Sequence, residues 1–180
     1  MINITDITIK DLTFTPFVMR EELLSRIQEL AININNNYEG KNPLFISVLN
    51  GSFMFTSDLM KQIDIRSEIN FIKVSSYEGT ESTVKIKQEV NFGKWVTDRH
   101  IIILEDIVDT GNTIRHILNN IQHFDPASVE VATLFLKPEC LDYDIDLKYV
   151  GFEIQNKFII GYGLDYDGQG RNYQDVYQLV

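Results

Sequence analysis

The chain has 180 residues, of which 44% are hydrophobic and 23% charged, and its formal net charge is −10. This length and composition suit one globular domain, and no apolar run approaches the roughly 18 residues of a membrane span. The acidic balance argues against non-specific nucleic-acid binding, which depends on Lys and Arg contacts to phosphates. We expect a cytoplasmic protein, because no signal peptide is visible and the single cysteine, Cys140, cannot form an internal disulfide.

The first half of the chain alternates between helical and extended patterns. Thr15-Pro16 predicts the start of a helix whose apolar stripe reaches Ile34, and the Asn-rich segment 33–42 predicts a loop. The continuous apolar run 44–49 predicts a buried strand, followed by a helix over residues 52–63. A second strand is expected over residues 69–74.

The second half continues the alternation after the polar, flexible segment 75–83. A half-exposed strand is expected over residues 84–90, a buried strand over 100–104 and another strand over 129–136. Between the last two, Ile114, Ile117, Leu118 and Ile121 form the apolar stripe of a helix. Short strands are expected within 149–154 and 157–162, and the alternation over 143–147 fits an edge strand.

Apolar strands that alternate with helices predict an α/β fold with a mainly parallel sheet covered on both faces. Binding sites in such folds lie at the carboxyl ends of the strands. The unusual polar residues of this chain follow predicted strands: Asn50-Gly51, 75–83, 105–113, Lys137-Pro138 and Asp165. The sequence therefore predicts one site at this edge of the sheet.

Three acids and a glycine turn follow the predicted strand 100–104. Residues 110–113, Thr-Gly-Asn-Thr, could bind a phosphate through helix N–H groups and hydroxyls, or Asp109 or Thr110 could simply cap the helix. Glu105 and Asp106 point opposite ways in extended chain, and one of them could accept hydrogen bonds from a sugar diol. Acids and a phosphate-binding turn together describe a cradle for ribose 5-phosphate.

Asp109-Thr110-Gly111 also has the form of an aspartic protease motif. Such enzymes need two carboxylates that share a proton, so a chain with one motif would have to dimerise. The α/β surroundings and the helix after Gly111 argue against this interpretation.

The segment ILEDIVDTGNT, residues 103–113, resembles the phosphoribosylpyrophosphate-binding motif of type I phosphoribosyltransferases. The resemblance extends from about residue 10 to the end and narrows to the hypoxanthine (hypoxanthine-guanine) phosphoribosyltransferases. It is carried further by SVLNGSFMFTSDL (47–59), VSSYEGTEST (74–83), FLKPE (135–139) and FIIGYGLDYDGQGRNY (158–173). The implied fold is a single domain, 1–180, with a mainly parallel twisted sheet flanked by helices. A small hood from the N- and C-terminal segments and a flexible lid at about 75–90 would complete it.

The resemblance implies purine salvage. The 5-phosphoribosyl group would pass from phosphoribosylpyrophosphate to N9 of a 6-oxopurine, hypoxanthine and also guanine, releasing pyrophosphate. Mg²⁺ is the implied cofactor and a homodimer or homotetramer the implied assembly, with no nucleic acid or membrane as partner. An alternative is a non-catalytic regulator on the same fold that senses phosphoribosylpyrophosphate or a nucleotide.

The resemblance also implies residue roles. Asp109 would be a general acid/base near purine N7, while Glu105 and Asp106 would hold the ribose hydroxyls, directly or through Mg²⁺. Asp165 would bind a second Mg²⁺. The remaining implied substrate contacts are Leu49, Asn50 and Gly51 with Arg171 at pyrophosphate, Ser76 and Tyr77 in the lid, Thr110, Gly111, Asn112 and Thr113 at the 5-phosphate, Lys137 at O6, Phe158 stacked on the base and the Ile159 backbone at its edge.

Two positions depart from the family pattern. Asn50 stands where the family usually has lysine, and the lid lacks a glycine that often follows its Ser/Thr pair. Residue type alone also permits ordinary structural roles, with Lys137 in a solvated turn and Phe158 in the core.

Overall fold

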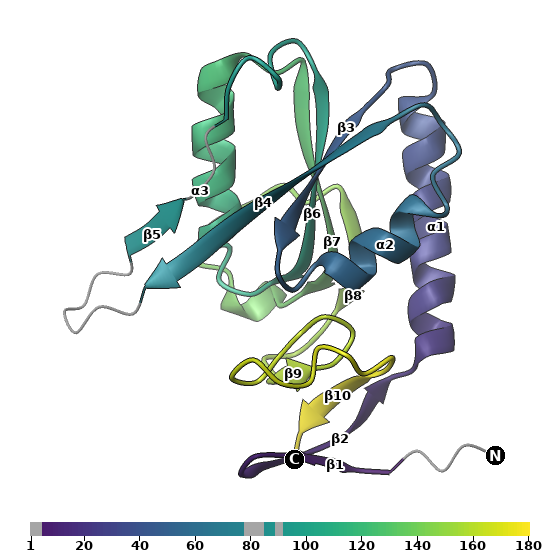
Figure 1. Ribbon diagram of the computed structural model, residues 1–180, viewed down its shortest axis with the longest axis vertical. Coiled ribbons are helices and arrows are strands. Elements are labelled where there is room, and N and C mark those ends of the chain that lie inside the picture. Colours follow the sequence, from purple (N-terminus) through teal and green to yellow (C-terminus); the bar gives the residue numbers. More distant parts are fainter. Residues whose placement is uncertain (1–4, 78–84, 89–91) are drawn as a thin grey trace.

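The computed structural model of the protein describes residues 5–77, 85–88 and 92–180. Within these ranges the chain forms three α-helices, two short 3-10 helices and two sheets (Figure 1). The helices are α1 (Arg20–Tyr38), α2 (Phe53–Met60), α3 (Asn112–Ile121), η1 (Gln122–Phe124) and η2 (Pro138–Cys140). The strands are β1 (Ile7–Ile9), β2 (Leu12–Val18), β3 (Leu44–Leu49), β4 (Glu68–Tyr77), β5 (Lys85–Gln88), β6 (His100–Val108), β7 (Ser128–Leu136), β8 (Tyr149–Glu153), β9 (Ile159–Ile160) and β10 (Val176–Leu179).

The larger sheet has the strand order β5-β4-β3-β6-β7-β8. Strands β4, β3, β6, β7 and β8 run parallel to one another, and β5 pairs antiparallel with β4. The mainly parallel α/β sheet expected from the alternating pattern is confirmed. Parallel pairing brings the carboxyl ends of β3, β6 and β7 to one edge of the sheet, where the polar segments follow.

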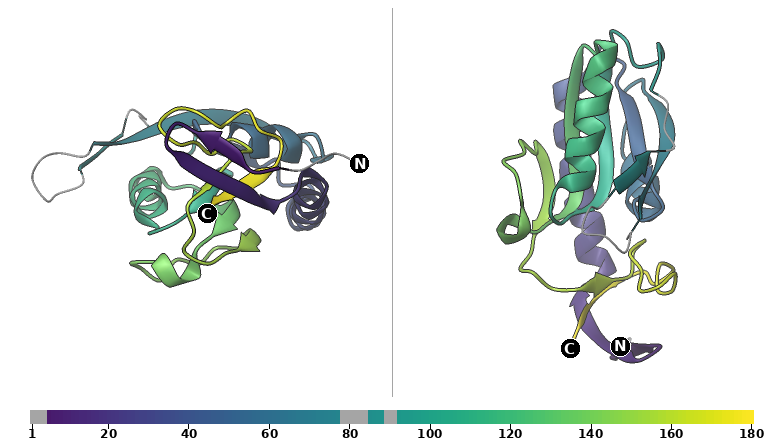
Figure 2. Two further views of the ribbon diagram at one scale, coloured as in Figure 1. Left: turned by 90° about the horizontal axis from the view of Figure 1, so that it is seen from below. Right: turned by 90° about the vertical axis from the view of Figure 1, so that its left-hand side faces the viewer.

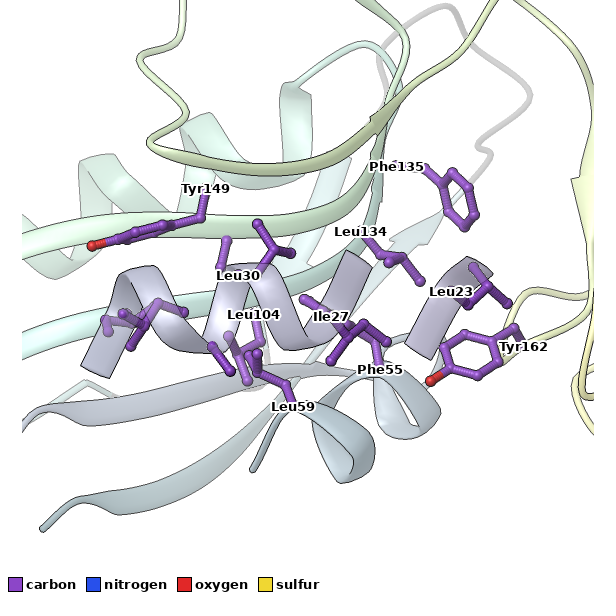
Figure 3. Close-up of a cluster of buried hydrophobic side chains, with 14 of the residues drawn as sticks. Leu23, Ile27, Leu30, Phe55, Leu59, Leu104, Leu134, Phe135, Tyr149 and Tyr162 are labelled. Carbon is purple, nitrogen blue, oxygen red and sulfur yellow. The ribbon is translucent and has the colours of Figure 1, made fainter. Parts of the chain in front are cut away.

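Helices cover both faces of this sheet (Figure 2). On one face, α1 and α2 pack over Phe45, Leu104 and Leu134 in the core cluster shown in Figure 3. On the other, α3 packs over Ile46, Ile103 and Val131. Strands buried on both faces read as continuous apolar runs, which is why 44–49 and 101–104 carry so few polar residues.

The smaller sheet is antiparallel, in the order β1-β2-β10-β9, and joins the N-terminal strands to the C-terminal ones. Figure 1 shows it beyond the carboxyl ends of β3 and β6. Among the residues that the structure describes, no helix is long and apolar enough to cross a membrane.

The predicted start and end of the first helix are wrong. Thr15 and Pro16 lie in β2, where Pro16 pairs with Tyr177 beside an irregularity in the register, and α1 begins only at Arg20. A missing N–H is tolerated at such an irregularity. The Asn-rich segment is helical as far as Tyr38, because the buried Tyr38 ring anchors the last turn in the core.

Two further features differ from the sequence prediction: one expected strand does not form, and one strand is longer than expected. Residues 143–147 form no strand, and their alternation arises because Ile145 and Leu147 pack against the α3 core cluster. Strand β6 continues to Val108, so Glu105 and Asp106 lie inside a strand and not after it. The pairing of β6 with β7 up to Val108 and Leu136 holds this polar extension in place.

Candidate active site

Glu105 and Asp106 are buried acids near the carboxyl end of β6. The two residues are 6% and 9% exposed. Their side chains have different neighbours, as expected for consecutive residues in a strand. Glu105 lines a cavity of about 90 Å³ together with residues 107–114. The Asp106 carboxylate lies against Gly51, where a Cβ atom would collide with it.

Burial raises the pKa of both carboxyls. Burial, and then the negative charge of Asp106, raise the pKa of Glu105 well above its usual range. Burial also raises the pKa of Asp106. One buried oxygen, Oε2 of Glu105, has no hydrogen-bond partner among the described residues. A buried carboxylate oxygen without a partner is costly and marks a place where a ligand donor or cation would be stabilised.

The turn between β6 and α3 depends on Gly111. This residue is the N-cap of α3 with φ +81°, and a side chain here would collide with Ile145. Gly111 brings no side chain to cap the helix, but Asn112 N donates a hydrogen bond to Thr110 Oγ1 at 3.4 Å. Of the two expected capping residues, Thr110 thus binds one N–H at the start of α3, whereas the Asp109 carboxylate pairs with Lys137. The first turn of a helix has further N–H groups that can bind an anion.

Asp109 and Lys137 meet across neighbouring strands. Each follows the last residue of its strand, and Val108 pairs with Leu136 in the register of β6 and β7. The Lys137 N–H donates to the Val108 carbonyl at 3.0 Å, and Nζ lies 2.7 Å from Asp109 Oδ2. Lys137 is 5% exposed, so the interpretation as a solvated turn residue is wrong.

Phe158 presents an open ring beside the small sheet. It is 42% exposed, which excludes the core position that its sequence context also permitted. Its ring centroid lies 6.1 Å from that of Phe14 and 5.9 Å from that of Tyr166, which meets it edge-on. Ile159 follows in β9, where pairing with β10 fixes its backbone.

Asp165 and Arg171 form an ion pair at the far end of the site. Arg171 Nη2 lies 2.6 Å from Asp165 Oδ1, and Nη1 donates to the Gly163 carbonyl at 2.7 Å. Asp165 Oδ2 accepts a hydrogen bond from Gly168 N. Gly163 has φ +100° and packs so closely on the Gly51 carbonyl that a side chain would collide with it.

The β3–α2 loop, Asn50–Ser52, rests on a network that sequence reasoning missed. The peptide between Leu49 and Asn50 is cis, and Asn50 is exposed. Beneath it, Ser47 Oγ lies 2.8 Å from Ser52 Oγ and 2.7 Å from Thr56 Oγ1, with all three hydroxyls buried. The available signal was Ser47, a polar residue within an apolar run.

The lid expected at about 75–90 lies largely outside the described residues. Of Ser76 and Tyr77 the structure describes the backbone at the end of β4, paired with Ile86 and Lys85 of β5.

Comparisons with known proteins agree with this arrangement. A family model described as a phosphoribosyl transferase domain matches residues 19–167. The chain is 42% identical over 155 residues to the hypoxanthine-guanine phosphoribosyltransferase of Streptococcus mutans, covering 84% of this chain and 85% of the relative. It is 40% identical over 154 residues to the hypoxanthine-guanine-xanthine phosphoribosyltransferase of Tritrichomonas foetus, covering 85% and 84%.

Among solved structures, a hypoxanthine phosphoribosyltransferase from Staphylococcus aureus is similar, with a TM-score of 0.86 and 37% identity. The match covers 92% of this chain and 90% of that one. The aspartic protease interpretation has no support in these similarities. With its parallel sheet, its acidic strand end and a family match over most of its length, the chain belongs to the phosphoribosyl transferase family.

Proposed function

We propose that the protein transfers the 5-phosphoribosyl group from phosphoribosylpyrophosphate to N9 of hypoxanthine, and of guanine, in purine salvage. The products are IMP or GMP and pyrophosphate. The observation that carries this proposal is the meeting of Asp109 and Lys137 next to the acids of β6. The names of relatives about 40% identical over most of their length support the same reaction.

Asp109 and Lys137 suit the edge of a 6-oxopurine. O6 and N7 are neighbours on one edge of the base, and the Lys137 ammonium and the Asp109 carboxylate are neighbours 2.7 Å apart. Lys137 would donate to O6, and Asp109 would exchange a proton at N7 as charge develops on the ring. Adenine carries an amino group in place of O6, which would leave the donors of Lys137 unmatched.

The acids of β6 suit the sugar. Glycosyl transfer develops positive charge at the anomeric carbon, and carboxylates fixed nearby stabilise such charge. Glu105 lines the same small cavity as the turn after β6. A pentose with its 5-phosphate at Thr110–Thr113 would therefore bring its hydroxyls to Glu105, and Asp106, on the side of Gly51, would act with Glu105 through Mg²⁺.

Mg²⁺ is the proposed cofactor, and the donor set fits it. Within the described ranges no cluster of three or more His, Cys, Asp and Glu side chains could hold a metal ion. Magnesium sites at phosphates usually combine one or two carboxylates with substrate oxygens and water. Glu105 and Asp106 would hold one ion and Asp165 a second, and the unpartnered Oε2 of Glu105 supports the first site. Bound Mg²⁺ would neutralise the pyrophosphate leaving group.

The remaining assignments complete the proposal. Leu49, Asn50, Gly51 and Arg171 would contact pyrophosphate, Phe158 would stack on the base and the Ile159 backbone would line its edge. We place all of residues 1–180 in one domain, with the small sheet as a hood and residues of about 75–90, including Ser76 and Tyr77, as a lid that excludes water. The single cysteine, Cys140, fits a reducing cytoplasm.

A homodimer or homotetramer is part of the proposal. Phe53 and Phe71 are exposed and line an apolar hollow of about 450 Å³ with Met60 and Ile69. Exposed apolar side chains that gather in one hollow suit burial against a second subunit. Light scattering after gel filtration should give a dimer or tetramer for the wild type and a smaller species for Phe71→Glu. A wild-type monomer would contradict this assignment.

A steady-state assay with phosphoribosylpyrophosphate and Mg²⁺ tests the reaction. We expect product with hypoxanthine and guanine and little with adenine, and xanthine serves as the third 6-oxopurine. Absence of product with both hypoxanthine and guanine at high enzyme concentration would refute the proposal. Calorimetry that showed ligand binding without turnover would favour the non-catalytic regulator.

A further inference from the structure

A buried tyrosine links the C-terminal part of the site to α2. The Tyr162 hydroxyl donates to Asp58 Oδ2 at 2.6 Å, and Asp58 also pairs with Lys61 Nζ at 2.8 Å. Figure 3 shows Tyr162 at one end of the core cluster, beside Leu23 and Phe55. Helix α2 begins directly after the β3–α2 loop, so the bond connects this loop to a segment more than a hundred residues further along the chain.

The protonation states suit a strong hydrogen bond. Burial, and then the hydrogen bond to Asp58, raise the pKa of Tyr162, so the phenol remains a donor. Burial alone would raise the pKa of Asp58, but hydrogen bonds from Lys61 and Tyr162 outweigh it and lower that pKa. A neutral donor therefore meets a charged acceptor, which is the stronger class of hydrogen bond.

The residues on either side of Tyr162 restrict the position of the backbone around it. Gly161 and Gly163 have φ +92° and +100°, and side chains there would collide with the carbonyls of Asp175 and Gly51. Tyr162 N donates to the Tyr173 carbonyl, and Gly163 N donates to the Arg171 carbonyl. Residues 161–173, which we call the C-terminal loop, thus fold back on themselves, with Tyr162 at the base and the turn 166–169 at the closed end.

The C-terminal loop carries the ion pair of Asp165 and Arg171. On one side the small sheet holds it, because Lys10 pairs with Asp167 and the Tyr166 hydroxyl donates to Asp11. On the other side Tyr162 holds it to α2. Two contacts therefore hold Arg171 near the β3–α2 loop: the bond from Tyr162 to Asp58 and the close packing of Gly163 on the Gly51 carbonyl.

We propose that Asp58 and Tyr162 are positioning residues for the pyrophosphate half of the site, which they set without touching substrate. This inference rests on the proposed function, because it assigns Arg171, Asp165 and Gly51 to one ligand. The base half is held by other contacts: Lys137 follows β7 in the large sheet, and the Phe158 ring meets Tyr166, which the small sheet holds through Asp11. Loss of the bond should therefore weaken binding of pyrophosphate and phosphoribosylpyrophosphate and spare binding of the purine.

The test compares Tyr162→Phe, Asp58→Ala and the double variant with the wild type. We expect each variant to raise KM for phosphoribosylpyrophosphate and Kd for Mg²⁺-pyrophosphate, measured by calorimetry, about tenfold. KM for hypoxanthine should stay within about twofold. The double variant should match the single ones, because all three remove the same bond.

Two control variants separate positioning from general destabilisation. Lys61→Ala removes the other partner of Asp58 and leaves Tyr162 bonded. Tyr149→Phe removes another buried phenol, hydrogen-bonded to Asn37, at the opposite end of the core in Figure 3. Both controls should keep wild-type KM and Kd values even where thermal unfolding shows a lower Tm.

Lower Tm with unchanged KM and Kd in Tyr162→Phe would overturn the inference, as would equal losses for pyrophosphate and hypoxanthine. A wild type that binds Mg²⁺-pyrophosphate but forms no nucleotide would refute the proposed reaction, while the calorimetry would still decide the role of the pair. A wild type that does not bind pyrophosphate would overturn the inference itself.

Discussion

At the scale of single residues, the main feature of the site is that its acids lie in opposite environments, one paired with a lysine and one buried. Asp109 is half-exposed and held by a buried ammonium, while Glu105 is buried with an oxygen that lacks a partner among the described residues. The first arrangement keeps a carboxylate where we propose that the edge of the base binds. The second leaves a buried oxygen without a hydrogen bond, and a donor or a cation from a ligand would stabilise it.

Asp109→Asn should separate turnover from binding. The amide keeps the size of the side chain and can still accept a hydrogen bond from Lys137, but it cannot exchange a proton with purine N7. We expect kcat to fall about 100-fold or more, with KM for both substrates within a few-fold of the wild type. Equal losses in kcat and in binding would show that Asp109 only anchors substrate.

At the scale of elements, the sequence predicted the sheet and its helices well, because 44–49, 100–104 and 114–121 carry periodic apolar patterns. The predicted boundaries were less accurate where tertiary contacts decided them. Pro16 lies in a strand that pairs with Tyr177, more than 150 residues further along the chain, and the buried Tyr38 lets α1 continue through the asparagines before it. The meeting of Asp109 and Lys137 followed from strand order, which local patterns do not specify.

The Tyr162–Asp58 bond could not be predicted in the same way. Its two residues lie in different halves of the chain, and each has an ordinary local context, one in a helix and one in a Gly-Tyr-Gly turn. The glycines did signal an unusual backbone. What they pack against, the carbonyls of Gly51 and Asp175, depends on the contact between the β3–α2 loop and the C-terminal loop.

Gly111→Ala should disturb the turn between β6 and α3. A side chain there is strained at φ +81° and collides with Ile145, which costs about 1–2 kcal/mol if the turn keeps its conformation. We expect KM for phosphoribosylpyrophosphate to rise about tenfold, because the turn shifts to relieve the strain. Binding of hypoxanthine, measured as its KM, should change less.

Gly40→Ala is the matched control for this variant. Gly40 also has a positive φ, +73°, but a side chain there meets nothing within 4 Å. Thermal unfolding should show that both variants lose stability, and only Gly111→Ala should change KM. Equal KM values in the two variants would refute a substrate role for the turn.

At the scale of the whole molecule, the site spans two sheets. The large sheet supplies the acids and Lys137, and the small sheet with its loops supplies Phe158, Asp165 and Arg171. Neither sheet could complete the proposed set alone. The β3–α2 loop and the C-terminal loop meet where Gly163 packs on the Gly51 carbonyl, so we expect ligand binding to stabilise this contact.

The buried acids make the stability of the metal-free, ligand-free protein depend on pH. The folded-state pKa of Glu105 is raised above its unfolded value. Below the unfolded pKa the carboxyl is protonated in both states, and its full contribution to stability is present. That contribution is lost as pH rises through the folded pKa, because the unfolded state ionises more easily. Glu105→Gln removes the ionisable group at similar size, so it should remove this loss. At about pH 8 we expect the variant to melt at least about 2 °C above the wild type, and at about pH 5 the difference should shrink towards zero.

Comparison with a second charge-neutralising variant isolates this effect. Glu153→Gln removes one negative charge at an exposed position, so it measures the effect of general charge repulsion in this acidic chain. Its Tm difference from the wild type should vary little between the two pH values. A Glu105→Gln variant that is less stable than the wild type at about pH 8 would show that a charged Glu105 stabilises the ligand-free fold. The buried acids would then stabilise the fold and would not be a destabilising feature that is kept for ligand binding.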